Sequence, residues 1–469
     1  MKIPKIRAYV LDGLAHAFNP KSIAVVGASR SSTKVGWNII KKLREDGYKG
    51  KIYPVNPRAH PYPIFGEKTY KTVRDIPEPV DLVVIAVPFF LVKSVMKDCV
   101  ANGAKIAVVI SSGFKEVGAK ELEEEITNYC RNNGFPFIGP NLLGLGNTHS
   151  NLNLGFMPYL PKKGNVAIFS QSGANLLAWL GMSRTQRLGI SLFTGLGNMA
   201  DIGFPEFIIY AGKDKNTKVI ALYIEGLQSK KEFIKACQEV VPKKPIIALA
   251  AGSESTKGKS AAAAHTGSTA LTSEEYDKLF EEAGIIRVRT QQEFVDVALA
   301  LSMQPLPKGG WVFITNGGGS GVLATDECAR RGLDLLEIKG FLKQQMRAAV
   351  GPLGSPLNPV DLTGMATWRD YKMAMEAAIT NPDVGGIVVS VCPTSITYPE
   401  KIAVIIYEIY KKYKDLGKPI IAQFQGGPEC ERANNWLKDR GIPSYLTPEQ
   451  AVAGMAALSK YAEIKSKFS

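Results

Sequence analysis

The stretch SIAVVGASRSSTKVGWN, residues 22–38, decides the fold of the first part of this 469-residue chain. It joins a short apolar run to Gly27 and then to a helical pattern that begins near Gly36. Gly27 allows a tight turn, and the helix start offers free N–H groups to an anion. A continuous apolar run, without alternation, is typical of a strand covered on both faces. The stretch therefore predicts a doubly wound α/β unit with its ligand at the carboxyl ends of the strands.

The same succession of apolar runs and helical patterns continues along the chain. The first set continues with KIYPVN (51–56), DLVVIAV (81–87), KIAVVIS (105–111) and PFIGPN (136–141). The second set contains NVAIFSQSG (165–173), SLFTGLG (191–197), KVIALYIEG (218–226) and KPIIALAAGS (244–253). The third set contains WVFITNGGGSG (311–321), LDLLEIKG (333–340), GGIVVSVCP (385–393) and KPIIAQFQGGP (418–428). We expect three doubly wound Rossmann- or flavodoxin-like domains with mostly parallel sheets, over residues 1–147, 148–304 and 305–469.

Cysteine usage and hydropathy argue against several classes of protein. The 6 cysteines include no CxxC pair and no CxxC-plus-His cluster, which argues against a disulfide framework and predicts no metal site on this chain. No apolar run reaches the ~18 residues that a membrane helix needs, and the N-terminus lacks the apolar region of a secretory signal. We therefore expect a cytoplasmic protein without membrane contact.

The charge balance favours anionic partners without naming one. Lys and Arg number 57 against 43 Asp and Glu, so the net charge is +14. Because the chain has no basic run of five and no helix-turn-helix or RNP-like motif, we expect no nucleic acid. Phosphorylated small molecules, an acidic partner subunit and a lysine-rich solvated surface explain the charge equally well.

The first glycine turn differs from a dinucleotide-binding turn. It lacks the GxGxxG pattern, and the second strand ends in VNPR rather than in the acidic residue that binds a ribose 2′-OH. Arg30, Lys34 and Arg58 instead place positive charge around the expected pocket. A ligand with a pyrophosphate and an additional phosphate, such as coenzyme A, fits this charge better than NAD does. A purely structural Rossmann turn stays the alternative.

Two later strand–turn–helix segments repeat the anion-binding device. Ser170-Gln171-Ser172-Gly173 follows one apolar run, and Gly317 to Gly321 follow another. Each places hydroxyls and backbone N–H groups at a helix N-terminus, where the helix dipole favours an anion. Each is also compatible with an ordinary tight turn.

A histidine and a glutamate complete the set of candidate reactive groups. His265 lies in KGKSAAAAHTGST, residues 257–269, and a capping box at Thr272-Ser-Glu-Glu275 predicts a new helix after it. Glu225 follows a buried strand, where a carboxylate can hold one imidazole nitrogen as N–H and leave the other nucleophilic. A solvated glutamate and a passive histidine on an alanine-rich helix are the alternatives.

Several short motifs occur in an order that is specific as a whole. They are GASR with VNP, GPNLLG (139–144), SQSG (170–173), GN-x-AD (197–201), YIEG (223–226), the KGK…AHTGS loop, TNGGGSGVLATD (315–326) and NPVDLTG (358–364). Together they resemble the α-subunit of NDP-forming acyl-CoA synthetases of the archaeal ADP-forming acetyl-CoA synthetase type, in the succinyl-CoA synthetase superfamily. The chain departs from that pattern at Leu142, where many relatives carry Cys, and in TNGGGSG, which is richer in glycine than the usual TNAGGPG.

The resemblance implies a reaction in which phosphate attacks acyl-CoA and the resulting acyl phosphate phosphorylates His265, which Glu225 orients. It also implies a separate ATP-grasp β-subunit that holds Mg-ADP or Mg-ATP, in an assembly such as α2β2. The implied phosphate-binding residues are Ser170, Ser172, Gly173, Gly318, Gly319 and Ser320. The implied CoA-binding residues are Gly27, Ala28, Ser29, Arg30, Lys34, Gly36, Val55, Asn56, Pro57, Arg58, Pro88, Ser111 and Ser112.

Other functions stay open beside this one. A CoA-binding regulatory or scaffold protein of the same fold would need neither His265 nor Glu225. A nicotinamide-dependent oxidoreductase is disfavoured by the turn sequence, and no segment suggests the extra domain of a protein acetyltransferase. The acid used, whether acetate, a branched-chain acid or an aryl acid, and the choice between ADP and GDP are not encoded in these motifs.

Overall fold

The computed structural model describes residues 7–253, 255, 257–258 and 271–469. It contains three separate, mostly parallel sheets, which confirms the predicted fold class. The chain forms two compact units. The first runs to Arg184 and resumes at Leu188–Arg287, and the second combines Thr185–Arg187 with Val288–Ser469. The predicted domain boundaries stay predictions.

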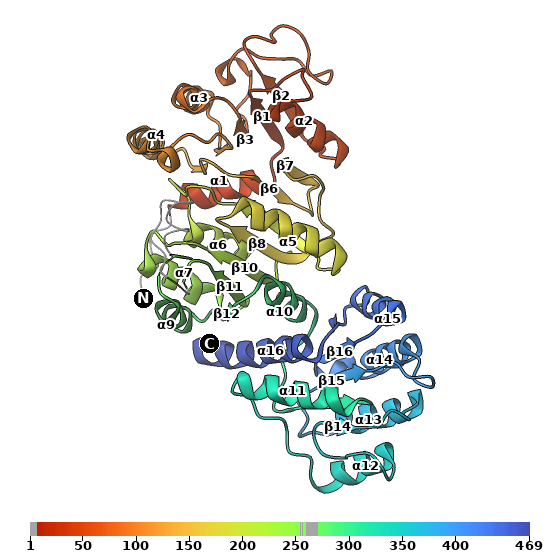
Figure 1. The fold of residues 1–469 in the computed structure, drawn as a ribbon. Helices are drawn as coiled ribbons and strands as arrows, with labels where there is room; N and C mark the ends of the chain where they lie inside the picture. The colour runs from red at the N-terminus through yellow and green to blue at the C-terminus, as the bar shows by residue number, and fades with distance from the viewer. Residues whose placement is uncertain (1–6, 254, 256, 259–270) are drawn as a thin grey trace. The chain divides into compact units, whose positions relative to one another are not determined.

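The first sheet is parallel, with the strand order β2-β1-β3-β4-β5. Its strands are β1 (Ser22–Val26), β2 (Lys51–Val55), β3 (Leu82–Ile85), β4 (Ile106–Val109) and β5 (Phe137–Ile138). Its helices are α1 (Ala8–Phe18), α2 (Val35–Glu45), α3 (Phe89–Asn102) and α4 (Lys120–Asn132). Helix α2 lies on one face of the sheet, and α3 and α4 lie on the other (Figure 1).

The opening stretch forms the predicted strand–turn–helix unit, from β1 to α2. Gly27 has φ +91°, and a Cβ there would lie 2.3 Å from the carbonyl oxygen of Ala86. A Cβ on Gly36 would lie 2.1 Å from the carbonyl oxygen of Gly27. Both glycines are therefore required by the close approach of strand, turn and helix.

The second sheet has the order β12-β11-β10-β8-β9-β6-β7. Its strands are β6 (Gly144–Asn147), β7 (Leu152–Gly155), β8 (Lys163–Ser170), β9 (Ile190–Gly195), β10 (Val219–Ile224), β11 (Ile246–Ala250) and β12 (Ile286–Val288). Its helices are α5 (Gly173–Thr185), α6 (Phe204–Lys213), α7 (Lys230–Val240) and α9 (Ser273–Ala283). Strand β6 runs antiparallel to β9 and β7, whereas β8, β9, β10 and β11 are parallel and buried. The buried parallel strands meet at one carboxyl edge.

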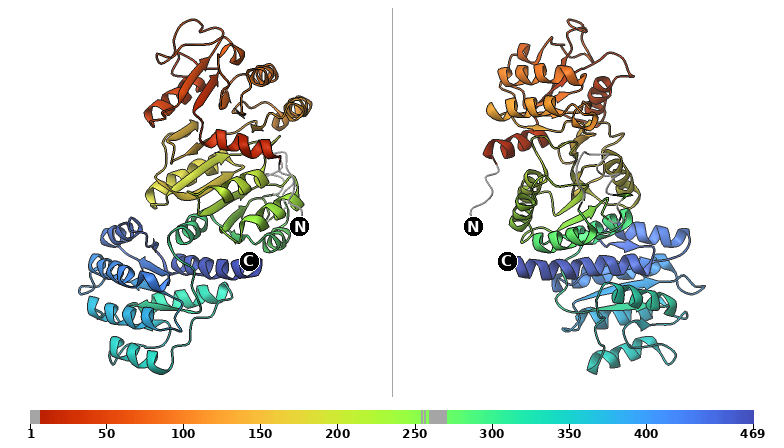
Figure 2. Two further views of the ribbon diagram at one scale, coloured as in Figure 1. Left: turned by 180° about the vertical axis from the view of Figure 1, so that it is seen from behind. Right: turned by 60° about the vertical axis from the view of Figure 1, so that its left-hand side comes forward.

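The third sheet is parallel, with the order β14-β13-β15-β16-β17. Its strands are β13 (Trp311–Thr315), β14 (Val360–Asp361), β15 (Gly386–Val391), β16 (Ile420–Phe424) and β17 (Ser444–Tyr445). The helices of this unit are α10 (Gln291–Met303), α11 (Gly318–Arg330), α12 (Gly340–Val350), α13 (Trp368–Thr380), α14 (Pro399–Tyr413), α15 (Pro428–Lys438) and α16 (Pro448–Phe468). Helices α13, α14 and α15 lie on one face, and α11 and α16 lie on the other (Figures 1 and 2).

One strand of this third set was wrongly predicted. LDLLEIKG, residues 333–340, forms no strand, and the place beside β13 is taken by β14 from NPVDLTG. The segment alternates exposed charged residues with partly buried leucines, and the Leu336 N–H reaches the Trp311 carbonyl at 3.4 Å. It therefore passes the sheet without pairing as a strand. No helix among the described residues is long and apolar enough to cross a membrane.

Candidate active site

The predicted CoA-binding residues lie at the carboxyl ends of β1, β2, β3 and β4, in the loops and helix starts that follow. The Asn56 side chain connects two of these loops, because its Nδ2 donates to the Ala28 carbonyl at 2.7 Å and its Oδ1 accepts from the Arg58 N–H at 2.9 Å. The Ser111 hydroxyl connects the ends of β4 and β3, since it accepts from the Val87 N–H and donates to the Val87 carbonyl. Polar side chains thus fix the loops relative to one another.

The rim of this edge is basic. Arg30, Lys34 and Arg58 are all exposed, and the Arg30 guanidinium lies 5.7 Å from the centre of the Tyr62 ring. Pro88 is the residue before α3, and Lys34 is the residue before α2, so two helix starts face the same edge. The arrangement suits a ligand that carries several phosphates.

The first predicted phosphate turn is rigid and buried. The Ser170 hydroxyl accepts from the Ser172 N–H at 3.1 Å and donates to the Ser172 carbonyl at 2.7 Å. The Ser172 hydroxyl accepts from the Asn175 N–H at 3.3 Å, which caps α5. The first N–H groups of α5, beginning at Gly173, are therefore held in a fixed direction.

Gln171 joins this turn to Glu225. Its Oε1 accepts from the N–H groups of Glu225, at 2.5 Å, and Gly226, at 3.1 Å. The strands carry the two segments to the same place, since Ser170 at the end of β8 pairs with Tyr223 at the end of β10. Glu225 is 4% exposed, which excludes the alternative of a solvated glutamate. The structure thus brings together Ser170, Ser172, Gly173 and Glu225.

Two tyrosines share the surroundings of Glu225. Burial raises the pKa of Tyr223 well above its usual value. The Glu225 carboxylate, to which the Tyr223 hydroxyl is hydrogen-bonded, raises this pKa further. Burial also raises the pKa of Tyr276 to about 12, and the charge of Glu225 adds to the shift. Both phenols therefore stay protonated at neutral pH and can act as hydrogen-bond donors.

His265 lies outside the described residues. The helix predicted after it is confirmed: α9 begins at Ser273, and Thr272 and Glu275 form the predicted capping box. On the near side, β11 ends at Ala250, and the Ala251 N–H donates to the Ile224 carbonyl, directly before Glu225. The Ser273 N–H donates to the Ser253 carbonyl at 3.1 Å, so the two ends of the intervening segment are hydrogen-bonded.

The second predicted phosphate turn, in the second unit, is held by a similar side-chain contact, but its helix begins with glycines. Gly318 and Gly319, the first residues of α11, are exposed. The Thr315 hydroxyl accepts from the Gly317 N–H at 3.0 Å, and Ser320 Oγ lies 3.3 Å from Cys392 Sγ. The Asp361 carboxylate at the end of β14 is also close, since its Oδ2 would lie 3.0 Å from a Cβ on Gly318.

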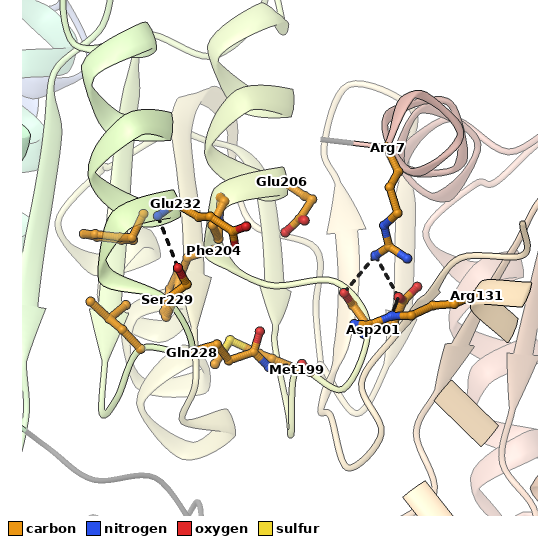
Figure 3. Close-up of a pocket in the computed structure, with 12 residues that line it drawn as sticks. Arg7, Arg131, Met199, Asp201, Phe204, Glu206, Gln228, Ser229 and Glu232 are labelled. Atoms are coloured by element: carbon orange, nitrogen blue, oxygen red, sulfur yellow. Dashed lines mark hydrogen bonds and ion pairs between the residues drawn. The ribbon is translucent and has the colours of Figure 1, made fainter. Parts of the chain in front are cut away.

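The GN-x-AD segment, residues 197–201, fastens the second sheet to the CoA-binding part of the same unit. Asp201 is buried and accepts from Arg7 Nη2 at 2.7 Å and from Arg131 Nε at 2.9 Å, as Figure 3 shows. Asn198 Nδ2 donates to the carboxylates of Glu116 and Glu123 at 2.7 Å each. A cavity of about 320 Å³ lies beside Asp201, and the two arginines that line it, Arg7 and Arg131, both bond the Asp201 carboxylate.

Sequence reasoning missed several of these residues. Gln171 lies inside the SQSG motif, yet its bridge to Glu225 joins residues 54 positions apart. Arg287, the middle residue of β12, bonds Ser253 and Ser273 and was also missed. A charged residue between the apolar residues of GIIRVRT was the available signal for a buried polar contact. Among the described residues no group of three His, Cys, Asp or Glu side chains is arranged to hold a metal ion.

Known protein families match all three sheets. Residues 21–148 match a CoA binding domain, residues 163–301 a succinyl-CoA ligase like flavodoxin domain, and residues 311–469 a Ligase-CoA domain. The chain is 40% identical to the acetate–CoA ligase [ADP-forming] I subunit alpha of Pyrococcus furiosus, over 96% of this chain and 98% of the relative. It is 34% identical to the 4-hydroxybutyrate–CoA ligase [ADP-forming] of Nitrosopumilus maritimus, over 95% of this chain and 64% of that longer relative.

A solved structure is equally similar. It is that of the dinucleotide forming acetyl-coenzyme A synthetase 1 of Ca. Korarchaeum cryptofilum, in complex with phosphate and ADP. The two chains are 40% identical, the match covers 97% of each, and the TM-score is 0.92. The chain therefore belongs to the ADP-forming acetyl-CoA synthetase α-subunit family of the succinyl-CoA ligase superfamily.

Proposed function

We propose that this chain is the catalytic α-subunit of an ADP-forming acyl-CoA synthetase in the cytoplasm, with acetate as its first candidate acid. The overall reaction converts acyl-CoA, ADP and phosphate into the acid, ATP and CoA. The bridge from Gln171 to Glu225 is the observation that supports it most directly, because it holds an anion-binding helix start and a buried carboxylate side by side. A scaffold protein that only binds CoA has no need of that pair.

The chemistry begins with a thioester. An oxygen of inorganic phosphate attacks the carbonyl carbon of acyl-CoA, so that a C–O bond forms and the C–S bond breaks. CoA leaves as the thiol with the proton that phosphate loses. The N–H groups at the start of α5 stabilise the phosphate and the acyl phosphate that forms, and the start of α11 offers N–H groups of the same kind to an anion in the second unit.

The phosphoryl group then moves to His265. A nitrogen of its imidazole attacks phosphorus, the N–P bond forms, and the P–O bond to the acyl group breaks to release the carboxylate. Glu225 accepts a hydrogen bond from the other ring nitrogen and keeps the attacking nitrogen unprotonated. Positioning and electrostatic stabilisation supply most of the catalysis in such transfers.

The last step needs a nucleotide. A terminal oxygen of ADP takes the phosphoryl group from His265, and the N–P bond breaks to give ATP. We place Mg-ADP on an ATP-grasp β-subunit in an α2β2 assembly; the name of the Pyrococcus relative, subunit alpha, supports the existence of a partner subunit. Relatives named for different acids support a substrate choice wider than acetate.

The test is a labelling experiment on the chain alone. Acetyl-CoA and ³²P-labelled phosphate are expected to give one acid-labile, base-stable label, which His265→Ala abolishes. His16→Ala serves as the matched control. His16 pairs with Asp81, which directly precedes β3 and so lies away from the carboxyl ends of the strands, and its loss should leave the label intact. Branched-chain and aryl acyl-CoA thioesters are tested in parallel. CoA binding without label from any thioester would favour the scaffold function instead.

A further inference from the structure

Arg287 contacts Ser253 and Ser273, the described residues on either side of the segment that contains His265. It is the middle residue of β12, between the buried Ile286 and Val288, and its side chain is 9% exposed. Ser253, three residues after β11, stands on one side, and Ser273, the first residue of α9, stands on the other. The Arg287 guanidinium thus lies between the two residues that flank segment 254–272.

The Arg287 guanidinium contacts both ends at once. Its Nη2 donates to the hydroxyls of Ser253, at 3.2 Å, and Ser273, at 3.0 Å. Its Nη1 donates to the Ser273 carbonyl and to Asp277 Oδ1, at 2.7 Å each. The two nitrogens of one planar fork thus hold four acceptors from both ends of the segment, an arrangement that a single ammonium nitrogen does not reproduce.

The strand that leads to Ser253 is bonded to the strand that leads to Glu225. The Ala251 N–H bonds the carbonyl of Ile224, the residue before Glu225. On the other side, Tyr276 follows Ser273 within the first turn of α9, and its hydroxyl lies within the electrostatic influence of both Glu225 and Arg287. Fixing Ser253 and Ser273 therefore fixes where the segment starts and ends relative to the carboxylate.

We propose that Arg287 is a positioning residue that holds Ser253 and Ser273, the residues on either side of segment 254–272, in place for phosphoryl transfer to His265. The inference rests on the proposed function. Arg287 acts through these two serines, because fixing them fixes where the chain on either side of His265 begins and ends relative to Glu225. Misplacement by about 1 Å at a reacting group costs on the order of 100-fold in rate.

Arg287→Met keeps the length of the side chain and removes its donors. With acetyl-CoA and ³²P-phosphate at saturation, the rate of His265 labelling is expected to fall about 10- to 100-fold while CoA affinity stays unchanged. The labelling rate of Arg287→Lys is expected to lie between those of the wild type and Arg287→Met, since one ammonium nitrogen keeps some donors but cannot reach all four acceptors. Asp277→Asn, which leaves the contacts to the serines, should label like wild type.

A second control separates positioning from general stability. Arg331→Met removes a paired arginine of the second unit, which bonds Glu293 and Glu327, and should not slow labelling at equal thermal stability. The Ser253→Cys/Ser273→Cys pair, added to Arg287→Met, offers the decisive comparison. The two serine hydroxyls share one Arg287 nitrogen, so a disulfide between these positions should restore labelling when oxidised and lose it when reduced.

The outcomes are distinct. Wild-type labelling speed in Arg287→Met, or persistent slow labelling despite a disulfide confirmed by mass, would overturn the positioning role. If Arg287→Met does not fold, Arg287→Lys with and without the disulfide answers the same question. Absence of label in the wild type itself would instead refute the proposed function.

Discussion

The two predicted phosphate turns are held by the same kind of side-chain contacts and differ at the helix start that follows. In the turn before α5, the Ser170 hydroxyl bonds the Ser172 backbone, and Gln171 accepts from the Glu225 N–H. In the turn before α11, the Thr315 hydroxyl bonds the Gly317 backbone, and Asn316 accepts from the Cys392 N–H. The Ser172 hydroxyl then caps α5, whereas Gly317 gives α11 no side-chain cap and the exposed Gly318 and Gly319 leave its first N–H groups open.

The two helix starts therefore differ in whether their first N–H groups are bonded by a side chain or left for a ligand. A side chain that satisfies backbone N–H groups stabilises the turn, but it also occupies space that a ligand would need. Glycine leaves that space empty at a cost of roughly 0.5–1 kcal/mol per helical residue. Substitution at the start of α5 is therefore expected to lower stability, and substitution at the start of α11 is expected to weaken phosphate binding.

The largest expected effect is that of Gln171→Leu. The N–H groups of Glu225 and Gly226 lose their acceptor while they stay buried, and each such loss costs about 1–3 kcal/mol. We expect the free energy of unfolding of the first unit to fall by about 2–4 kcal/mol, measured by urea titration. Gln425→Leu, beside the second turn, is the control, because its amide donates to the weakly accepting Cys392 sulfur. Equal losses of unfolding free energy in the two variants would mean that the bonds from Gln171 to the Glu225 and Gly226 N–H groups add no particular stability.

Glu225→Gln comes next. The neutral amide holds an imidazole N–H less strongly than the carboxylate does, so His265 labelling is expected to slow about 10- to 100-fold, or about 1.4–2.8 kcal/mol. CoA affinity, measured by calorimetry, should not change. Glu206→Gln is the matched control in the same unit, where the carboxylate accepts from the Gly203 N–H. A parallel loss of CoA affinity would assign Glu225 a different role.

The serine pair gives a smaller contrast. Ser172→Ala removes the cap that accepts from the Asn175 N–H and is expected to cost about 1 kcal/mol. Ser320→Ala removes only a contact between the first turn of α11 and the Cys392 sulfur, so its cost should stay below about 0.5 kcal/mol. Paired unfolding titrations measure the difference. The reverse order would mean that the second turn, and not the first, depends on its hydroxyl.

Gly319→Ala is expected to change stability in the opposite direction from the serine variants. A Cβ there meets nothing within 4 Å, so alanine should stabilise α11 by about 0.5–1 kcal/mol. If an anion approaches this turn, the same Cβ should raise the KM for phosphate. Gly173→Ala is the counterpart, because its Cβ would lie 3.3 Å from Leu143 Cβ and should lower stability. A stabilised Gly319→Ala enzyme with unchanged phosphate KM would remove Gly319 from the phosphate site.

Much of the fold was predictable because it is local. Continuous apolar runs such as SIAVV and the glycines around them specify buried strands and tight turns within about ten residues. Thr272 and Glu275 specify the start of α9 by the same kind of short-range contact. LDLLEIKG failed because its partly apolar pattern suits a strand, while sheet membership depends on which segment reaches the edge beside β13.

The sequence by itself determined the three mostly parallel sheets, the positions of the glycine turns and the resemblance that leads to His265 and Glu225. Only the tertiary structure decided that Gln171 bonds Glu225 and that Arg287 joins Ser253 to Ser273, across 54 and 34 residues respectively. Periodicity and capping report contacts between near neighbours in the chain. Contacts between strand ends depend on strand order and register, which the packing of the whole sheet fixes.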